Sequence, residues 1–223
     1  MTQPLASYLL SLPTRGVTPG RRGVRVLPKA LLFSDEARLG LEVSGSGWVA
    51  ALAALPTGSA LVFRHYSLAS APRLALARSV AQLCRRHDLL FFLAGPPRLA
   101  RRIGADGVHL PEGLLWRQAG RLRRRGAGAG RPLLVSAAAH GQRALRKAHQ
   151  TGADITLLSP VFPTASHPGA PCIGTNRFGL WCRSGAGRIF PLGGIDANTI
   201  RRLSPGRALP GAAAISALLP QKA

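Results

Sequence analysis

Short apolar runs recur along the chain, and each run is bounded by Gly, Pro or polar turn residues. This pattern is typical of parallel strands that are covered on both faces. We expect eight strands, at 30–33, 60–63, 89–93, 104–110, 133–136, 155–158, 188–192 and 211–216. Between them, helical periodicity predicts helices at 48–55, 72–87, 142–150 and 196–203, and a short helix that ends near Ile103.

This alternation of strands and helices over about 195 residues predicts a single (β/α)8 TIM barrel, near the small end of the range for that fold. The turn-plus-strand unit at 104–110 recurs at 152–158, and a weaker copy lies at 211–216. The alternative is an open doubly wound sheet. The glycines at 126–130 do not provide a dinucleotide fingerprint for it, because the spacing and the preceding strand are missing.

The segment 152–174 begins as a buried strand and continues as a loop rich in Pro, Gly and hydroxyl groups. Its prolines stiffen the backbone, and Thr164, Ser166 and His167 are polar side chains on it. Loops of this length within a domain usually have a function, although a plain crossover loop is the alternative. We therefore expect this loop to contact a ligand.

The other polar residues that follow predicted strands are the candidates for the rest of a site, since a barrel binds ligands at the carboxyl ends of its strands. They include Arg64, His109, Ser159, the Gly193–Gly194 pair and Ser216. The glycine pair and Ser216 follow the last two strands, where backbone N–H groups of such barrels commonly hold a phosphate. Together these residues favour an anionic small molecule.

Histidine is the one side chain among these candidates that is suited to proton transfer near neutral pH. His109 lies within a predicted strand, so a structural role inside the barrel is an equal alternative. His140 follows the small residues 137–139 and opens a helix, which leaves its ring room to face a ligand.

The 223 residues are 46% hydrophobic, which is enough to bury a core, and the formal net charge is +22. Such a charge is typical of nucleic-acid binding or of a GC-rich codon bias. Only three of the 30 cationic residues are lysines, and the arginines are scattered, which favours codon bias. We therefore consider nucleic acid an unlikely partner. Eight carboxylates in the whole chain leave few ligands for a hard metal ion.

Three cysteines without a CxxC motif indicate reduced thiols, and we expect a cytoplasmic protein. No apolar run is long enough for a membrane span. Residues 1–28 are basic, and their charges follow the apolar part, in the wrong order for a secretory signal. We expect a poorly ordered extension, or a start codon assigned too far upstream, before a barrel at 29–223. The oligomeric state is open, and a homo-oligomer is one alternative.

Four motifs, in this order, resemble the thiamine phosphate synthase and TenI family: 104–110 (GADGVHL), 159–164 (SPVFPT), 192–195 (LGGI) with Asn198, and 214–216 (AIS). The resemblance runs from about residue 29 to 219. It implies a (β/α)8 barrel, thiamine biosynthesis and a phosphorylated thiazole as ligand. By position, Gly193, Gly194 and Ser216 would hold the thiazole phosphate, and the loop at 164–167 would contact phosphate or pyrophosphate groups.

The synthases of this family join a pyrimidine pyrophosphate to the thiazole phosphate, with Mg²⁺ assisting the departure of pyrophosphate. At the positions of the two expected metal-binding acids the chain has Gly95, preceded by Ala94, and Leu114, with Glu112 nearby. The two expected lysines of the pyrophosphate site are Tyr66 and His167, whereas Arg64 is kept. These differences predict a chain without a metal cofactor, and Mg²⁺ would be needed only by a true synthase.

The TenI branch of the family shifts a proton on a thiazole carboxylate phosphate, in an aromatising tautomerisation that needs no metal. Its proton shuttle is a histidine at the start of the helix after strand five. His140 lies at the matching place, one residue later than the usual spacing from Ser136. We therefore expect a TenI-like tautomerase. A true synthase, or a catalytically silent binder of a phosphate ligand or a polyanion, is the alternative.

Overall fold

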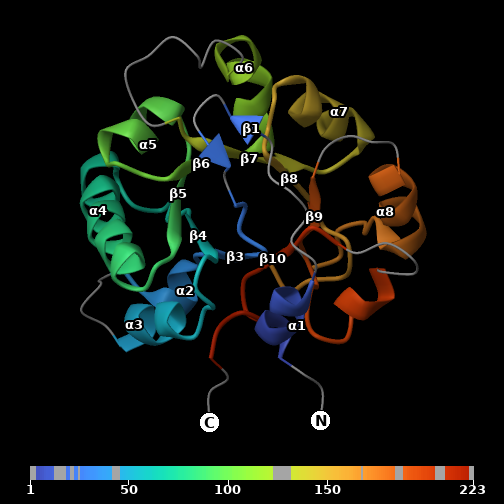
Figure 1. Ribbon diagram of the computed structural model, residues 1–223, viewed down its shortest axis with the longest axis horizontal. Helices are drawn as coiled ribbons and strands as arrows, with labels where there is room; N and C mark the ends of the chain where they lie inside the picture. The colour runs from blue at the N-terminus through green and yellow to red at the C-terminus, as the bar shows by residue number, and fades with distance from the viewer. Residues whose placement is uncertain are drawn as a thin grey trace.

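Eight parallel strands form the centre of the protein in a computed structural model, which describes residues 4–12, 19–20, 23–24, 26–41, 46–122, 132–166, 168–183, 188–203 and 209–220 (Figure 1). The strands are β3 (Ala30–Phe33), β4 (Ala60–Phe63), β5 (Leu90–Ala94), β6 (Gly107–Leu110), β7 (Leu134–Ala139), β8 (Ile155–Leu158), β9 (Ile189–Pro191) and β10 (Ala212–Ala214). Their order in the sheet is β10-β3-β4-β5-β6-β7-β8-β9, with every described pair parallel.

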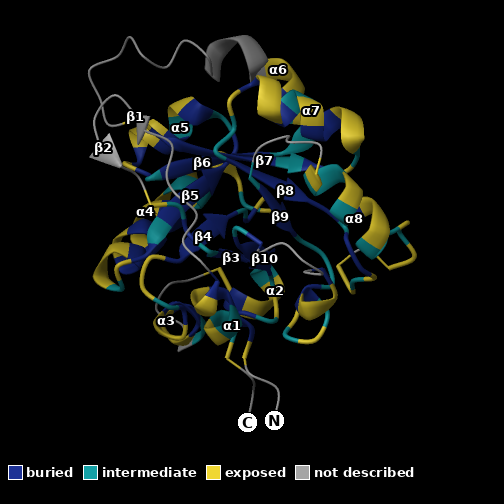
Figure 2. Ribbon diagram, turned by 45° about the vertical axis from the view of Figure 1, so that its right-hand side comes forward, coloured by how far each residue is buried: buried dark blue, intermediate teal, exposed yellow. Residues whose placement is uncertain are grey.

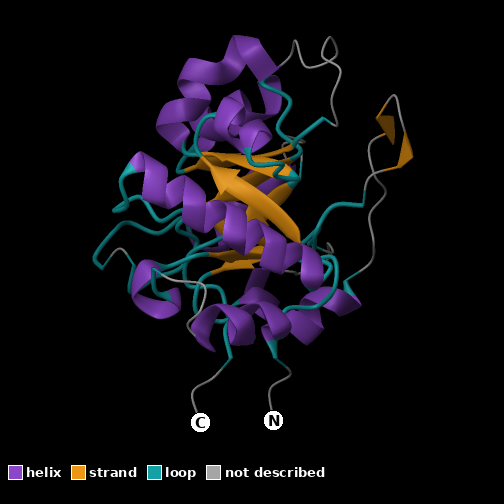
Figure 3. Cartoon of the chain, turned by 90° about the vertical axis from the view of Figure 1, so that its left-hand side faces the viewer, coloured by secondary structure: helices purple, strands orange, loops and turns teal. Residues whose placement is uncertain are grey.

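Helices surround the sheet on its outside (Figure 3). They are α1 (Leu5–Ser11), α2 (Glu36–Leu39), α3 (Ser46–Ala53), α4 (Ser70–Arg86), α5 (Pro97–Arg102), α6 (Glu112–Leu122), α7 (Gln142–Gln150), α8 (Gly174–Arg183) and the 3-10 helix η1 (Ile200–Leu203). A small antiparallel pair, β1 (Pro19–Gly20) and β2 (Gly23–Val24), lies apart from the main sheet.

The prediction of a (β/α)8 barrel is confirmed, because the two ends of the sheet order, β9 and β10, lie next to each other (Figure 1). Their close approach is visible at Gly211, just before β10. A Cβ atom at this position would lie 2.4 Å from the Phe190 ring of β9 and 2.4 Å from the Lys29 carbonyl oxygen. The barrel is therefore nearly closed, and Gly211 has no room for a side chain.

Alternation along the strands divides the core into two layers. In β3, Leu31 and Phe33 belong to the cluster inside the barrel, whereas Leu32 belongs to the layer between strands and helices. The inner cluster also includes Phe92 of β5, whose ring would be 2.4 Å from a Cβ at Gly107 of the neighbouring β6. Buried strands inside a shell of partly exposed helices are visible in Figure 2.

The predicted strands at 30–33, 60–63 and 155–158 agree with the structure at both ends. The fifth predicted strand is longer than expected, because β7 continues to Ala139 through a run of alanines. Helices α6 and α8 were not predicted individually, and in the stretch predicted as a helix at 196–203 only the residues of η1 are helical.

Part of the basic N-terminal segment packs against the barrel, which differs from the poorly ordered extension that we expected. Leu5 and Leu9 of α1 are buried in the outer core layer. The Lys29 Nζ donates a hydrogen bond to the Leu10 carbonyl, at 3.1 Å, and another to the Leu12 carbonyl at the end of the helix. The barrel itself begins at Ala30, close to the predicted boundary.

No helix in the described ranges is both long enough and apolar enough to cross a membrane. The longest described helix, α4, has 17 residues, four of which are arginines. Its buried residues include Ala77, Val80, Ala81 and Cys84, which recur at helical spacing on one face.

Candidate active site at the carboxyl ends of the strands

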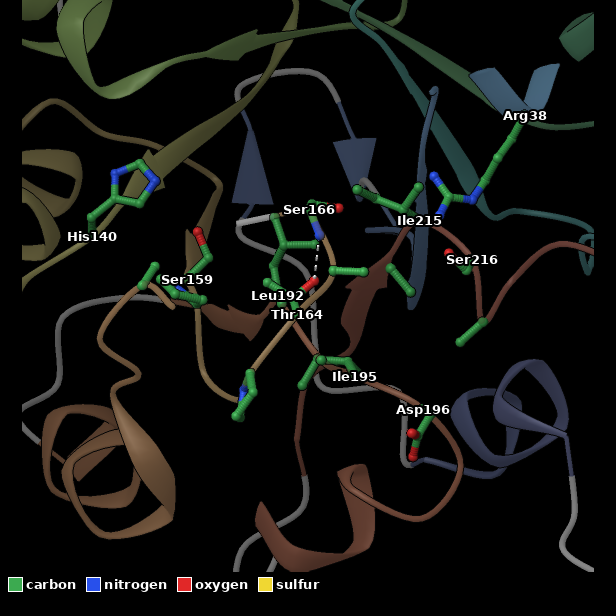
Figure 4. A pocket seen from close by; sticks show the side chains of 18 of the residues that line it. Arg38, His140, Ser159, Thr164, Ser166, Leu192, Ile195, Asp196, Ile215 and Ser216 are labelled. Carbon is green, nitrogen blue, oxygen red and sulfur yellow. Dashed lines mark hydrogen bonds between the residues drawn. The ribbon is translucent and has the colours of Figure 1, made fainter. Parts of the chain in front are cut away.

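A cavity of about 450 Å³ lies at the carboxyl ends of the barrel strands (Figure 4). Eight of the ten residues predicted to form a site line it: Arg64, His140, Ser159, Thr164, Ser166, Gly193, Gly194 and Ser216. Of the other two, His109 is not among the lining residues, and His167 lies outside the described residues. The structure therefore brings together residues that follow several different strands.

The turn after β9 contains two glycines, and neither position has room for a side chain. Gly193 and Gly194 have φ angles of 87° and 63°, in the left-handed region that favours glycine. A Cβ on Gly193 would lie 2.8 Å from the Pro160 Cα, and one on Gly194 would lie 2.5 Å from the Pro163 carbonyl oxygen. The turn thus needs glycine at both positions because the loop after β8 packs directly on it.

Backbone hydrogen bonds join these two loops. The Val161 N–H donates to the Leu192 carbonyl at 3.0 Å, and the Phe162 N–H donates to the Gly193 carbonyl at 3.0 Å. No hydrogen bond with a described residue uses the N–H groups of Gly193 and Gly194. Successive free N–H groups in a turn form an anion-binding concavity, so this turn is suited to hold a phosphate.

Asp196, which also lines the cavity, accepts hydrogen bonds within the same turn. Its Oδ1 accepts hydrogen bonds from the N–H groups of Asn198 and Thr199, both at 2.8 Å, and the Thr199 hydroxyl donates to the Gly194 carbonyl at 2.8 Å. Burial alone would raise the pKa of Asp196, but the hydrogen bonds from Thr199 and Asn198 outweigh it and lower the pKa. The carboxylate therefore stabilises the turn, and its Oδ1 atom already accepts hydrogen bonds from the protein.

Arg64 lines the other side of the cavity, and the main chain holds its guanidinium in place. Its Nε and Nη2 both donate to the Ser34 carbonyl, each at 3.0 Å, and the group lies over the Phe33 ring at 5.4 Å. Burial lowers the pKa of Arg64, and interactions with Tyr66, Asp35 and Glu36 oppose this shift. Arg64 makes no ion pair with a described carboxylate, so a ligand anion would be its natural partner.

A buried network supports Arg64 from behind. The Ser34 Oγ accepts the Arg64 N–H at 2.8 Å and lies 3.0 Å from Nδ1 of His65, whose Nε2 lies 3.0 Å from the Gly40 carbonyl. Nε2 must donate to that carbonyl, so Nδ1 accepts the Ser34 hydroxyl proton. Burial lowers the pKa of His65, in agreement with a neutral ring. A second cavity of about 220 Å³ shares Arg64 with the first.

His140 lies at the exit of β7, on the opposite side of the cavity from Arg38 and Ser216 (Figure 4). The Oε2 atom of Glu112 accepts hydrogen bonds from both His140 Nδ1, at 2.7 Å, and the His140 backbone N–H, at 2.9 Å. The His140 side chain is 56% exposed. Its ring is therefore accessible and is held by a carboxylate from the neighbouring strand exit.

His109 lies inside the barrel. It is 4% exposed, and its Nδ1 is 3.0 Å from the Oγ of Ser136, its register partner on β7. The Phe33 ring packs edge-on against it, with ring centroids 5.1 Å apart. Burial, with smaller contributions from Arg64 and His140, lowers the pKa of His109 to about 3. This position agrees with the alternative stated above for His109, a structural role inside the barrel.

The described residues offer a poor set of ligands for Mg²⁺. Gly95 has φ 133° and no side chain, and the side chain of Leu114 is apolar. The nearby Glu112 already accepts two hydrogen bonds from His140. Asp35 is paired with Arg38 at 3.0 Å. Within the described ranges, no three metal-binding side chains gather in one place.

Arg38 and two pairings, Glu112 with His140 and Ser34 with His65, were not predicted from the sequence. Glu112 is 28 residues away from His140, and Ser34 is 31 residues away from His65. Neither separation along the chain produces a pattern that can be seen in the local sequence. The sequence signal for these residues is their position just after a strand, since neighbouring strand exits meet in a barrel. That position places them at one end of the barrel but does not pair them.

The family model described as thiamine monophosphate synthase matches residues 45–218. The chain belongs to the thiamine phosphate synthase and TenI family. This finding confirms the family that the four sequence motifs indicated, and the matched range contains all eight of the predicted site residues that line the cavity.

Curated relatives in this family are named thiamine-phosphate synthases. That of Synechococcus sp. (strain WH7803) is 35% identical over 153 residues, or 68% of this chain and 42% of that protein. That of Thermus thermophilus is 33% identical over 58% of this chain and 60% of that protein. The chain thus aligns with less than two thirds of either protein. With the Chromobacterium violaceum protein it is 34% identical over 75% of each.

Solved structures agree on the fold. The thiamine phosphate pyrophosphorylase from Pyrococcus furiosus has a TM-score of 0.65 at 23% identity, covering 84% of this chain and 85% of that chain. The YdjI aldolase from Escherichia coli K12 has a TM-score of 0.54 at 10% identity, covering 85% and 75%. At these identities the likeness shows the barrel alone.

Proposed function

We propose that this family member is a tautomerase that acts on a phosphorylated thiazole without a metal ion. The observation that supports the proposal is a change of residue types at one side of the cavity, from metal-binding acids to a histidine held by a carboxylate. The positions at which the family's synthases are expected to have magnesium-binding acids are Gly95 and Leu114. The carboxylate that is nearby, Glu112, instead holds His140, a group suited to proton transfer.

The ligand would lie across the cavity with its phosphate at the turn after β9. The free N–H groups of Gly193 and Gly194, together with Ser216 after β10, would bind the phosphate. The ring would then extend toward Ser159 and His140. Arg64 would face a second anionic group of the same ligand, since its charge is buried and has no carboxylate partner among the described residues.

In the proposed reaction, His140 would accept a proton from one position of the thiazole and return a proton to another. The net charge of the ligand is the same before and after, and the gain in aromaticity drives the shift. No pyrophosphate leaves, so the reaction needs neither Mg²⁺ nor the lysines that are replaced by Tyr66 and His167. The chain's own residues would bind the phosphate, orient the ring and move the proton.

The second candidate is a true thiamine phosphate synthase in thiamine biosynthesis, as the names of the relatives indicate. Arg64 and Thr164 in the cavity favour it, because both match the synthase motifs. A third candidate is a catalytically silent binder of a phosphate ligand or a polyanion. Binding to heparin that survives about 0.2 M salt would support a true polyanion site.

The first experiment incubates the purified full chain with the pyrimidine pyrophosphate, the thiazole phosphate and Mg²⁺. We expect no thiamine phosphate above background, because the metal-binding acids are absent. Formation of thiamine phosphate at ordinary enzymatic rates would overturn the proposal in favour of the synthase.

The second experiment measures the tautomerisation of the thiazole carboxylate phosphate by the wild type and by His140→Ala. We expect kcat to fall by about 10²- to 10⁴-fold in the variant, as is usual when a general acid–base is lost. His149→Ala is the matched control, since His149 is exposed on α7. Unchanged kcat in His140→Ala would remove this histidine from the mechanism.

A further inference from the structure

We infer that Glu112 is a positioning residue that fixes the proton of His140 on Nδ1 and leaves Nε2 as the proton-accepting atom for the ligand. Where it concerns catalysis, this inference rests on the function proposed above. The assignment of the proton does not, because it follows from the hydrogen bonds around the ring.

One oxygen atom of Glu112 makes both contacts. Oε2 lies 2.7 Å from His140 Nδ1 and 2.9 Å from the His140 backbone nitrogen. Both distances are in the range of charge-assisted hydrogen bonds. These two hydrogen bonds to one oxygen atom fix the ring relative to its own main chain. The ring therefore rotates less freely than that of an exposed histidine normally does.

A carboxylate can only accept hydrogen bonds, so the short contact requires a proton on Nδ1. In the neutral ring the lone pair must then be on Nε2. Nε2 has no hydrogen-bond partner among the described residues. Free histidine prefers the opposite tautomer, with the proton on Nε2. Glu112 thus reverses the intrinsic preference and makes the outer nitrogen the basic one.

The fold explains why these two residues meet. Glu112 is the first residue of α6, directly after β6, and His140 follows β7, the neighbour of β6 in the sheet. Parallel neighbours end at the same edge, so their exits lie side by side. Gly141, the N-cap residue of α7, has no side-chain cap. Glu112 also satisfies the backbone N–H of His140, the residue just before this N-cap, and that structural role is the competing explanation.

The tautomer can be measured directly. Long-range ¹⁵N–¹H correlation spectra of the full chain, labelled at histidine, distinguish the two neutral tautomers at about pH 8. His140→Ala identifies the signal. We expect the Nδ1–H tautomer in the wild type and in Glu112→Gln, whose amide oxygen still accepts. In Glu112→Ala we expect the Nε2–H tautomer. Finding the Nε2–H tautomer of His140 in the wild type, or the Nδ1–H tautomer in Glu112→Ala, would overturn the inference.

Kinetics separate positioning from mere structural support. With the thiazole substrate, Glu112→Ala should lower kcat at least about tenfold while KM changes by less than about threefold, and Glu112→Gln should recover part of the loss. Asp88→Asn, at the opposite end of the barrel, controls for the loss of one negative charge. Equal kcat in the wild type and Glu112→Ala would overturn the positioning role.

The two proposals fail in different ways. A wild type that shows the Nδ1–H tautomer but has no tautomerase activity would contradict the proposed function and leave the assignment of the proton intact. An active wild type whose ring is in the Nε2–H form would contradict the role of Glu112 alone. A thermal melt of each variant shows whether the fold is retained.

Discussion

The two sides of the cavity are built in different ways. On the side of β8, β9 and β10, the turn with Gly193 and Gly194 presents main-chain groups beside side chains such as Ser216, and backbone hydrogen bonds between loops hold it, as at Val161 and Leu192. On the side of β3 to β7, side chains such as Arg64 and His140 form the surface, and other side chains or carbonyls hold them. The first side is suited to bind a phosphate, and the second presents the side chains that the proposed reaction would use.

This difference determines how easily each part of the site can change by substitution. A main-chain site depends on backbone shape, so the glycines at 193 and 194 cannot be replaced without moving the loop that packs on them. A side-chain site changes with single substitutions, and the chain departs from the motifs expected of a synthase at Gly95, Leu114 and Tyr66 on that side and at the side chain of His167 on the loop after β8. We therefore expect that binding and reaction can change independently in this barrel.

The largest effect should come from Gly194→Ala. The new Cβ would lie 2.5 Å from the Pro163 carbonyl oxygen at a φ of 63°, so the turn must move. We expect a loss of about 1–3 kcal/mol in the free energy of unfolding and a roughly 10- to 100-fold loss of affinity for the thiazole phosphate. Thermal denaturation and isothermal titration measure the two effects.

Gly179→Ala in α8 is the matched control. No atom lies within 4 Å of its added Cβ, and its φ is not positive, so the variant should be at least as stable as the wild type. If Gly194→Ala binds the ligand as well as this control does, the turn after β9 is not the phosphate site.

A smaller effect is expected from Arg64→Met, which removes the charge and keeps much of the side-chain length. We expect about a tenfold loss of affinity for a ligand with two anionic groups, and much less for inorganic phosphate, which would occupy the opposite side. Arg98→Met, on an exposed position of α5, corrects for the change in net charge. Equal losses for both ligands would contradict the division of the cavity into two sides.

The smallest effect on ligand binding is expected from the barrel interior beneath the cavity, where the change appears in the pH dependence of stability. His109 has a pKa of about 3 in the folded chain because it is buried, whereas an unfolded chain has a value of about 6.5. Between these values the unfolded chain binds more protons, so the free energy of unfolding falls as the pH is lowered from about 6.5 toward 3.

His109→Gln removes this contribution, and it can keep a hydrogen bond to Ser136. Its free energy of unfolding should therefore depend less steeply on pH between about 4 and 6, by roughly 1.4 kcal/mol per pH unit. The remaining dependence includes His65, whose pKa is also lowered by burial. Urea denaturation at several pH values tests this, and parallel curves for the two proteins would contradict a neutral buried His109.

Much of the barrel could be predicted from the sequence because its strands are short runs of buried apolar residues between turn residues. β3, β4 and β8 are local patterns of this kind, and their predicted ends agree with the structure. Helix α6 was less visible, and η1 makes a single 3-10 turn within a stretch that looked helical. The apolar residues of α1 were visible, but their contact with the barrel is a tertiary property.

The candidate site followed from the rule that strand exits converge, which placed Arg64, Ser159 and Gly193 around one cavity. The rule does not say whether a side chain at an exit points into the barrel or toward the ligand. His109 and His140 show both outcomes at neighbouring strands. It also does not reveal pairs such as Glu112 and His140, because contacts between exits depend on how far each loop turns before its helix starts.

The hydrogen bonds of Val161 and Phe162 to the turn after β9 also affect how backbone amides around the cavity exchange their hydrogens with solvent. Because these amides donate to the Leu192 and Gly193 carbonyls, the loop after β8 cannot open without breaking bonds to the turn after β9. The two segments should therefore become exposed to deuterium together, as one cooperative unit. A phosphate held at the glycines would slow the exchange of amides on a loop that the phosphate itself does not need to touch.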